Sequence, residues 1–102
     1  MVRALLTIRV HQGRETEFEQ AWRTIAERVR GEPGSIRQTL LRNPNESSTY
    51  MITSDWDSHD AFTRFERSPE QDVLTAPIRA LRASASMTLM DVVEHVERSS
   101  QR

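Results

Sequence analysis

Residues 35–56, SIRQTLLRNPNESSTYMITSDW, hold two extended segments separated by a polar loop. Residues 35–42 predict one strand, and the alternating side chains of residues 48–56 predict another. One face of the second segment carries Tyr50, Ile52, Ser54 and Trp56. Residues 43–47, NPNES, are a strong turn signal. Two strands around a short polar loop predict a β-hairpin.

Upstream of the hairpin, residues 2–10, VRALLTIRV, alternate with the period of two that is typical of a strand. After a turn at Gly13, apolar residues recur at steps of three and four. This spacing predicts an amphipathic helix from about Arg14 to Arg30. Its apolar stripe consists of Phe18, Ala21, Trp22, Ile25 and Val29.

Downstream, Asp57 or Ser58 is expected to cap a short helix. Ser68 and Gln71 have the spacing of a capping box, which opens a further helical stretch that Pro77 is expected to interrupt. Residues 86–96, SMTLMDVVEHV, predict a last strand, and the polar tail begins at about Glu97.

The predicted element order is therefore β-α-β-β-α-β in one domain, residues 1–102. This order is typical of the α+β, ferredoxin-like fold, an antiparallel sheet with helices on one face. The other sheet face mixes threonine and apolar side chains with polar ones. It is expected to meet the same face of a second copy, which predicts a homodimer.

Composition excludes several classes of function. The chain has 102 residues and a formal net charge of −1, so broad attraction to nucleic acid or anionic lipid is not expected. All 14 basic residues are arginine, which excludes a Schiff-base or P-loop lysine. Cysteine is absent, and with it thiolate chemistry. No signal peptide or long apolar run is evident, so we expect a cytoplasmic protein without membrane partners.

Candidate chemistry gathers around Trp56, which either wedges the sheet against a helix or forms the wall of a pocket for an aromatic ligand. His59 follows it at the expected mouth between sheet and helix. The three histidines include no i, i+4 pair, so no metal site is predicted. Asp55 and nearby carboxylates suit helix capping or a solvated rim, with general-base catalysis as the alternative. Arg37, on a strand, is expected to need an anionic or carbonyl partner.

Three segments, LLTIRV at 5–10, EPGSIRQ at 32–38 and DWDS at 55–58, together resemble the antibiotic biosynthesis monooxygenase family. The resemblance covers roughly residues 3–95. It implies a dimeric α+β barrel with a cleft between helices and sheet. Members include cofactor-free oxygenases of anthrone-type aromatic polyketides, quinol monooxygenases and haem-degrading enzymes. The chain looks most similar to small members associated with aromatic polyketide and spore-pigment biosynthesis.

The resemblance also implies site residues, and here the sequence departs from the family pattern. Trp56 matches a tryptophan that lines the substrate pocket in oxygenase members. Anthrone oxygenases carry an asparagine where this chain has Ile52, and many members carry a histidine where it has Phe65. Haem degradation is disfavoured, because the first strand offers Thr7 in place of an asparagine and the second helix lacks an iron-ligating histidine.

We therefore expect an enzyme without a cofactor that acts on an aromatic polyketide. Cofactor-free oxygenation needs a base and stabilisation of the resulting enolate, so that a carbanion can reduce O₂. His59 and Tyr50 are the candidate catalytic residues. The candidate substrate-binding residues are Trp56, Ile52, Ser54, Phe65, Arg37 and Gln38. The alternatives are a polyketide cyclase or folding protein that works by proximity without redox chemistry, and a non-catalytic dimeric binding protein.

Overall fold

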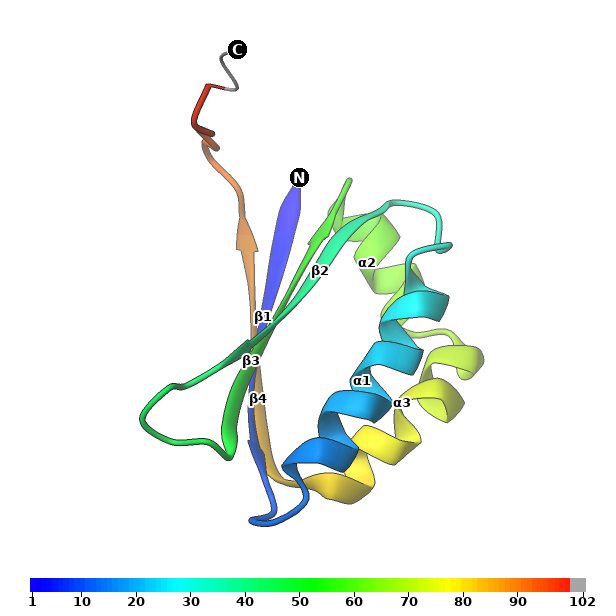
Figure 1. Cartoon of the computed structure of the whole chain (residues 1–102). Coiled ribbons are helices and arrows are strands. Elements are labelled where there is room, and N and C mark those ends of the chain that lie inside the picture. Colours follow the sequence, from blue (N-terminus) through cyan, green and yellow to red (C-terminus); the bar gives the residue numbers. More distant parts are fainter. Residues whose placement is uncertain (100–102) are drawn as a thin grey trace.

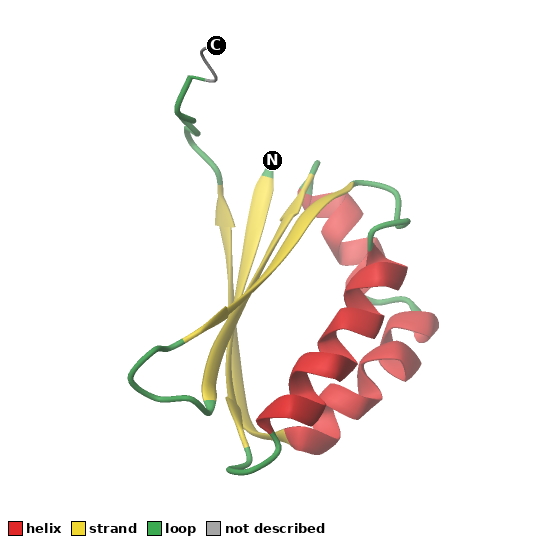
Figure 2. Ribbon diagram, in the orientation of Figure 1, coloured by secondary structure: helices red, strands yellow, loops and turns green. Residues whose placement is uncertain are grey.

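The computed structural model describes residues 1–99, and these form one sheet with a layer of helices on one of its faces (Figures 1 and 2). The elements run β1 (Val2–Val10), α1 (Glu15–Val29), β2 (Ser35–Arg42), β3 (Thr49–Trp56), α2 (His59–Glu66), α3 (Pro69–Leu81) and β4 (Arg82–Asp91). The strand order is β2-β3-β1-β4, and all neighbours are antiparallel. The predicted ferredoxin-like architecture is confirmed, with two helices in place of one before β4.

Strand alternation decides which side chains face the helices. Ile8 of β1 lies opposite Tyr50 of β3, and Val2 lies opposite Trp56. All four are buried, so this face of the sheet packs against the helix layer. The core therefore lies between the two layers, where Phe18 of α1 contacts Tyr50 with ring centroids 4.7 Å apart.

Gly34 brings α2 close to the end of the sheet. Its φ is +88°, a conformation that L side chains rarely adopt. A Cβ at this position would lie 2.5 Å from the Cβ of Ala61 in α2. The carbonyl of Gly34 also accepts a hydrogen bond of 2.8 Å from the backbone N–H of Asp57. A side chain here would therefore push α2 away from the sheet.

The two helices after β3 begin at serine caps. Ser58 accepts a hydrogen bond from the N–H of Ala61, and Ser68 accepts one from the N–H of Gln71. The expected interruption at Pro77 is wrong, because α3 continues through it to Leu81. Pro77 lies on the exposed side of the helix, where its ring is accommodated without displacing the buried Ile78 and Leu81.

The prediction of the last strand is wrong at both ends. β4 covers Arg82–Asp91 instead of 86–96. Its register explains the difference, because Asp91 lies opposite Val2, at the start of β1. Residues beyond Asp91 have no strand to pair with, although the N–H of Val92 still donates to the carbonyl of Met1. The following residues leave the sheet as an extended tail (Figure 1).

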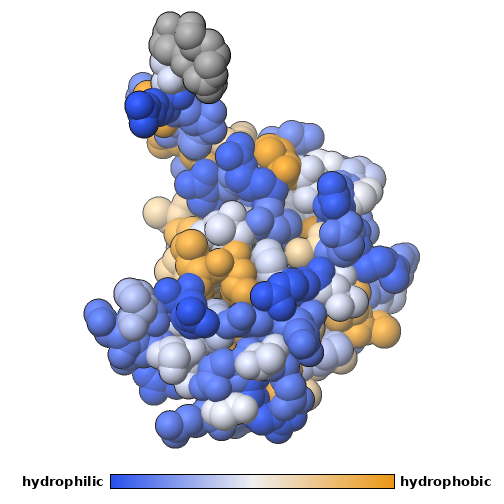
Figure 3. Space-filling model, viewed as in Figure 1, coloured by the Kyte–Doolittle hydropathy of each residue, from blue (hydrophilic) through white to orange (hydrophobic). Residues whose placement is uncertain are grey.

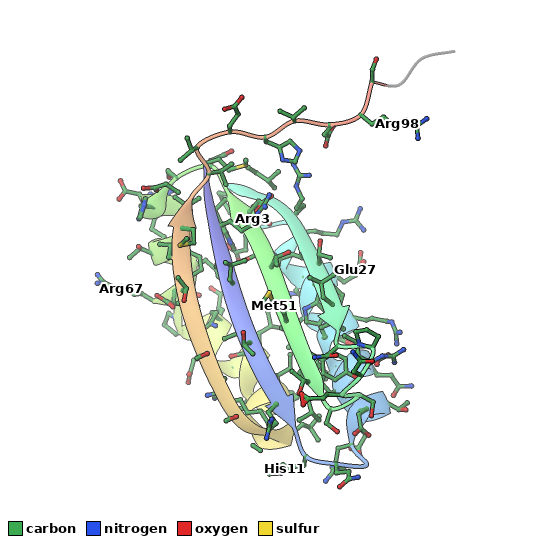
Figure 4. All side chains as sticks on the ribbon, turned by 90° about the vertical axis from the view of Figure 1, so that its left-hand side faces the viewer. Arg3, His11, Glu27, Met51, Arg67 and Arg98 are labelled. Atoms are coloured by element: carbon green, nitrogen blue, oxygen red, sulfur yellow. The ribbon has the colours of Figure 1, made fainter. Side chains whose placement is uncertain are left out.

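The second face of the sheet carries no helix. Figure 4 looks onto this open face, with Arg3 and Met51 on β1 and β3. Leu41 and Met90 are exposed on β2 and β4. Within residues 1–99, no helix is long and apolar enough to cross a bilayer.

Candidate functional site

A cavity of about 280 Å³ lies between the helix-facing side of the sheet and the helix layer. This is close to the lower end of the range of roughly 300–1,000 Å³ that small-molecule pockets occupy. Most of its lining is apolar. The sheet contributes Ala4, Leu6, Ile52 and Met87, and the helices contribute Trp22, Ile25, Val29, Phe62, Phe65 and Ile78.

Polar residues from five elements line the cavity. They are Gln38 and Ser54 from the sheet, Glu66 from α2, Gln71, Thr75 and Arg79 from α3, and Arg82 from the start of β4. An apolar chamber with a few polar groups is the usual construction of a site for a small organic ligand.

Gln38 supplies the clearest sign of a missing hydrogen-bond partner. It lies on β2 opposite Ser54, on the helix-facing side of the sheet. Its Nε2 is buried and has no hydrogen-bond partner among the described residues. Buried polar atoms in folded proteins are nearly always paired, because an unpaired one costs free energy. Gln38 also lines the cavity, so a turn of its amide toward a ligand oxygen there would satisfy this donor.

Four of the residues proposed from the sequence, Ile52, Ser54, Phe65 and Gln38, come together in this cavity. The alternation of β2 and β3 brings three of them to the same sheet face, and α2 contributes Phe65. Ser54 Oγ accepts a hydrogen bond of 3.1 Å from the indole Nε1 of Trp56. Its hydrogen remains available to a ligand.

Trp56 lies behind the cavity rather than in its lining. Its side chain is 1% exposed. The indole stacks on Phe65, with centroids 5.0 Å apart, and meets Phe62 edge-on at 5.9 Å. In this position Trp56 supports two rings that do line the cavity.

Tyr50 is buried near the other end of β3 and is also absent from the cavity lining. Its hydroxyl donates a hydrogen bond of 2.6 Å to Glu19 Oε2. Burial, with the neighbouring Glu19 carboxylate, raises the pKa of Tyr50 to about 12, although Arg42 opposes the shift. A phenol with this pKa stays protonated at neutral pH.

His59 and Arg37 lie elsewhere on the surface. His59 is 60% exposed at the start of α2, and its Nε2 lies 2.8 Å from Asp91 Oδ1 at the end of β4. Arg37 points to the open face of the sheet, where its Nε lies 3.1 Å from Asp55 Oδ2. The structure therefore does not bring these two residues, Trp56 or Tyr50 into the cavity with the other four. Their roles in the site stay predictions.

Asp55 forms the centre of a charged group on the open face. It is 1% exposed and accepts hydrogen bonds of 2.6 and 3.0 Å from Arg3. These bonds outweigh burial and, with Arg37 nearby, lower the pKa of the Asp55 carboxyl. Its side chain is therefore held as an ionised structural group on the face away from the cavity.

The sequence analysis missed part of the cavity lining. Gln71, Thr75 and Arg79 recur every four residues along α3, so the helical period was a signal that they share one side. Trp22 was placed in the apolar stripe of its helix but was not assigned to a site. Glu66 had no comparable signal, since the chain alone does not show which helix ends reach the cavity. No cluster of three or more metal-ligating side chains occurs within residues 1–99.

Comparison with known proteins agrees with this architecture. Residues 1–74 match the family model described as antibiotic biosynthesis monooxygenase. The chain belongs to the antibiotic biosynthesis monooxygenase family.

Two curated relatives in this comparison come from Streptomyces. The deoxynogalonate monooxygenase of Streptomyces nogalater is 35% identical over 75 residues, which is 74% of this chain and 63% of the relative. A 42.8 kDa protein in the whiE locus of Streptomyces coelicolor is 32% identical over 69 residues. That match covers 68% of this chain but only 17% of the relative. The chain thus spans less than two thirds of either protein.

Solved structures of family members have the same fold. SnoaB, a cofactor-independent oxygenase from Streptomyces nogalater, superposes with a TM-score of 0.85 and 28% identity over 95% of this chain and 97% of its own. A monooxygenase-family protein from Deinococcus radiodurans has a TM-score of 0.85 at 18% identity, over 98% of this chain and its whole length. The second comparison concerns the fold alone.

Proposed function

We propose that this protein is a cofactor-independent monooxygenase of an aromatic polyketide intermediate of the anthrone or phenol type. The observation that carries the proposal is the apolar, aromatic-walled cavity, whose lining includes Gln38, a side chain with a buried and unpaired hydrogen-bond donor. The similarity to SnoaB and to deoxynogalonate monooxygenase supports the same reaction class.

The proposed reaction converts a ring CH₂ group to a ketone. A base removes one proton, and the resulting carbanion is delocalised onto the neighbouring carbonyl oxygen as an enolate. The enolate reduces O₂ and forms a C–O bond, which gives a hydroperoxide after protonation. Loss of the second ring hydrogen with cleavage of the O–O bond releases water and leaves the quinone. One O₂ is consumed, and its atoms are divided between product and water.

In this proposal the cavity residues hold the ring and stabilise the enolate. Phe65 and Trp22 are aromatic surfaces on which a flat ligand can stack. The Nε2 group of Gln38 would donate to the enolate oxygen, where the negative charge develops. Glu66 is the carboxylate in the cavity lining, and the proposal makes it the proton acceptor.

The first test measures oxygen uptake and product mass, using metal-free protein with 1,8-dihydroxyanthrone in air. The expected product gains one oxygen and loses two hydrogens, and ¹⁸O₂ labels it once. Glu66→Gln should lower kcat, and His59→Gln should leave it unchanged. A loss of kcat in His59→Gln alone would instead support His59, the base proposed from the sequence. A rate no higher than in buffer alone would contradict the oxygenase proposal.

A cyclase that uses the same cavity without redox chemistry is the second candidate. It is favoured by Ile52 and Phe65, which line the cavity. The family resemblance implies an asparagine at the first position in anthrone oxygenases and a histidine at the second in many members. Altered ring closure of a poly-β-ketone with no oxygen gained would identify this activity. Ligand binding without either reaction would identify a binding protein.

We also propose that the open face of the sheet pairs with the same face of a second copy. Leu41 and Met90 are exposed there, and Figure 3 shows apolar side chains gathered among hydrophilic ones on the sheet side. Solvent contact of such a patch costs free energy that pairing would recover. Light scattering should give twice the 11.8 kDa mass of the chain. A mass of one chain at micromolar concentration would contradict the dimer.

A further inference from the structure

A bulge at the start of β4 decides the direction of an arginine side chain. The pairing of β1 with β4 shifts after Arg9, so that Val10 lies opposite Arg82 and Ala83 has no partner. In a regular strand, Ala83 would follow Ala85 onto the helix-facing side, and Arg82 would point to the open face. The bulge reverses this, and Arg82 joins the cavity lining.

The positive charge of Arg82 is not neutralised in the cavity. Arg82 is half-buried and has no ion pair or side-chain hydrogen bond within residues 1–99. The other arginine in the lining, Arg79, has partners. It donates a hydrogen bond of 2.6 Å to Thr75 Oγ1 and one of 2.8 Å to the carbonyl of Asp72. Glu66 also lines the cavity, but it is exposed at the C-terminal end of α2 and forms no ion pair with Arg82.

An unpaired guanidinium at the edge of an apolar chamber suits one chemical class of ligand. Its planar donors match the two oxygens of a carboxylate, and the surrounding apolar side chains strengthen the pair by excluding water. Because the sheet order is β2-β3-β1-β4, Arg82 and Gln38 lie on opposite edge strands. A ligand held by both would have a carboxylate at one end and a ring oxygen at the other.

We infer that Arg82 forms an anion subsite of the cavity and that the substrate is an aromatic polyketide bearing a carboxylate. This inference rests on the proposed function for the identity of the ring system. The subsite itself is a property of ligand binding, so it can be tested without turnover.

The binding test compares anthraquinone-2-carboxylate with its methyl ester, using quenching of tryptophan fluorescence. Trp22 lines the cavity and serves as the reporter. The acid should bind the wild-type protein roughly tenfold more tightly than the ester. Arg82→Gln should remove this preference while ester affinity stays the same, and Arg82→Lys should retain part of it.

Arg67→Gln is the matched control, because it removes the same charge from an exposed position. Figure 4 shows Arg67 projecting outward beyond the β4 edge of the sheet. This variant should keep the preference for the acid. Thermal unfolding of each variant establishes that the fold is retained before affinities are compared.

The outcomes separate this inference from the proposed function. Preference for the acid that depends on Arg82, without oxygen uptake on anthrones, supports the subsite and contradicts the oxygenase. Oxygen uptake with equal affinity for acid and ester supports the oxygenase and overturns the subsite. An Arg82→Gln variant that weakens acid and ester equally also overturns it, since the role would then be packing. Failure of both ligands to bind overturns the subsite as well.

Discussion

The indole of Trp56 stacks on Phe65 with an interplanar angle of 28°, and of this pair only Phe65 lines the cavity. The sequence left two possible roles for Trp56, a structural wedge or a pocket wall. Its 1% exposure and its place behind Phe65 favour the wedge. A ligand in the cavity would meet Phe65 first and contact Trp56 only through it.

Trp56→Ala should therefore act mainly on stability. Removing a buried tryptophan leaves a cavity and is expected to lower the free energy of unfolding by about 3–5 kcal/mol. Chemical denaturation measures this directly. Trp22→Ala is the matched comparison, since Trp22 is partly exposed and lines the cavity. It should cost less stability and more ligand affinity. A stable Trp56→Ala variant that cannot bind ligand would restore the pocket-wall assignment.

Gln38→Leu should lower ligand affinity without lowering stability, whereas Trp56→Ala should act mainly on stability. The substitution removes a buried donor that has no partner in the fold, so the free energy of unfolding should stay constant or rise by about 1–2 kcal/mol. Ligand affinity should fall roughly 2- to 10-fold through loss of one hydrogen bond. Denaturation and fluorescence titration measure the two effects.

Gln20→Leu provides the control for that variant, because it makes the same change on the exposed side of α1. It should alter neither stability nor affinity by much. If Gln38→Leu loses stability instead, the amide has a structural role and its assignment to a ligand is wrong.

The fold was accessible from the sequence where periodicity was strong, as in β1, α1 and the β2–β3 hairpin. The last strand was misplaced because VVEHV, residues 92–96, has the composition of a strand, whereas ASAS at 83–86 does not. Pairing with β1 overrides this local preference. The register of Val2 against Asp91 determines where β4 stops.

On the strands, the sequence predicted the candidate site only to the extent that alternation shows which side chains share a face. Alternation placed Ser54 on one strand face with Tyr50, Ile52 and Trp56, and in the structure this face meets the helices and Gln38 lies opposite Ser54. It could not show that Tyr50 is engaged by Glu19, because that contact depends on how α1 packs across the sheet. Arg82 was missed because the expected last strand began only at residue 86, and the bulge that sets the direction of Arg82 has no reliable sequence signal.

Asp55→Asn should destabilise the fold. Asp55 is buried and paired with Arg3 and Arg37, both of which would lose a charged acceptor. Hydrogen bonds to charged groups are worth roughly 1.5–3 kcal/mol, and partial exposure of the arginines favours the lower part of that range. Urea denaturation at neutral pH should show the loss. Asp57→Asn, at an exposed position that forms no ion pair with any residue of the described range 1–99, should change stability far less.

The same ion pairs predict an acid dependence of stability. The pKa of Asp55 is lowered in the fold, chiefly by the hydrogen bond from Arg3. Its contribution is therefore present above the ordinary aspartate value of 3.8 and is lost as pH falls through the lowered folded pKa. Unfolding curves between neutral pH and pH 3 should fall less steeply for Asp55→Asn than for wild type. Parallel curves would contradict this account.

The alkaline titration of Tyr50 can be measured without a signal from any other tyrosine. The chain has one tyrosine, no lysine and no cysteine, so tyrosinate absorbance reports this side chain alone. Burial and the Glu19 carboxylate raise the pKa of Tyr50 to about 12. The unfolded chain loses this proton near pH 10. The unfolded state therefore binds fewer protons above pH 10, and stability should fall between pH 10 and 12.

Tyr50→Phe tests both the titration and the assignment of Tyr50 as a catalytic residue. It should remove the part of the stability loss that Tyr50 causes between pH 10 and 12 and cost about 0.5–1.5 kcal/mol at neutral pH through loss of the bond to Glu19. Oxygen uptake should be retained, because the hydroxyl is committed to Glu19 outside the cavity lining. A titration midpoint near 10 in the native protein would show that the phenol is not held as described. Loss of turnover in a stable Tyr50→Phe variant would instead place its hydroxyl in the proton transfer.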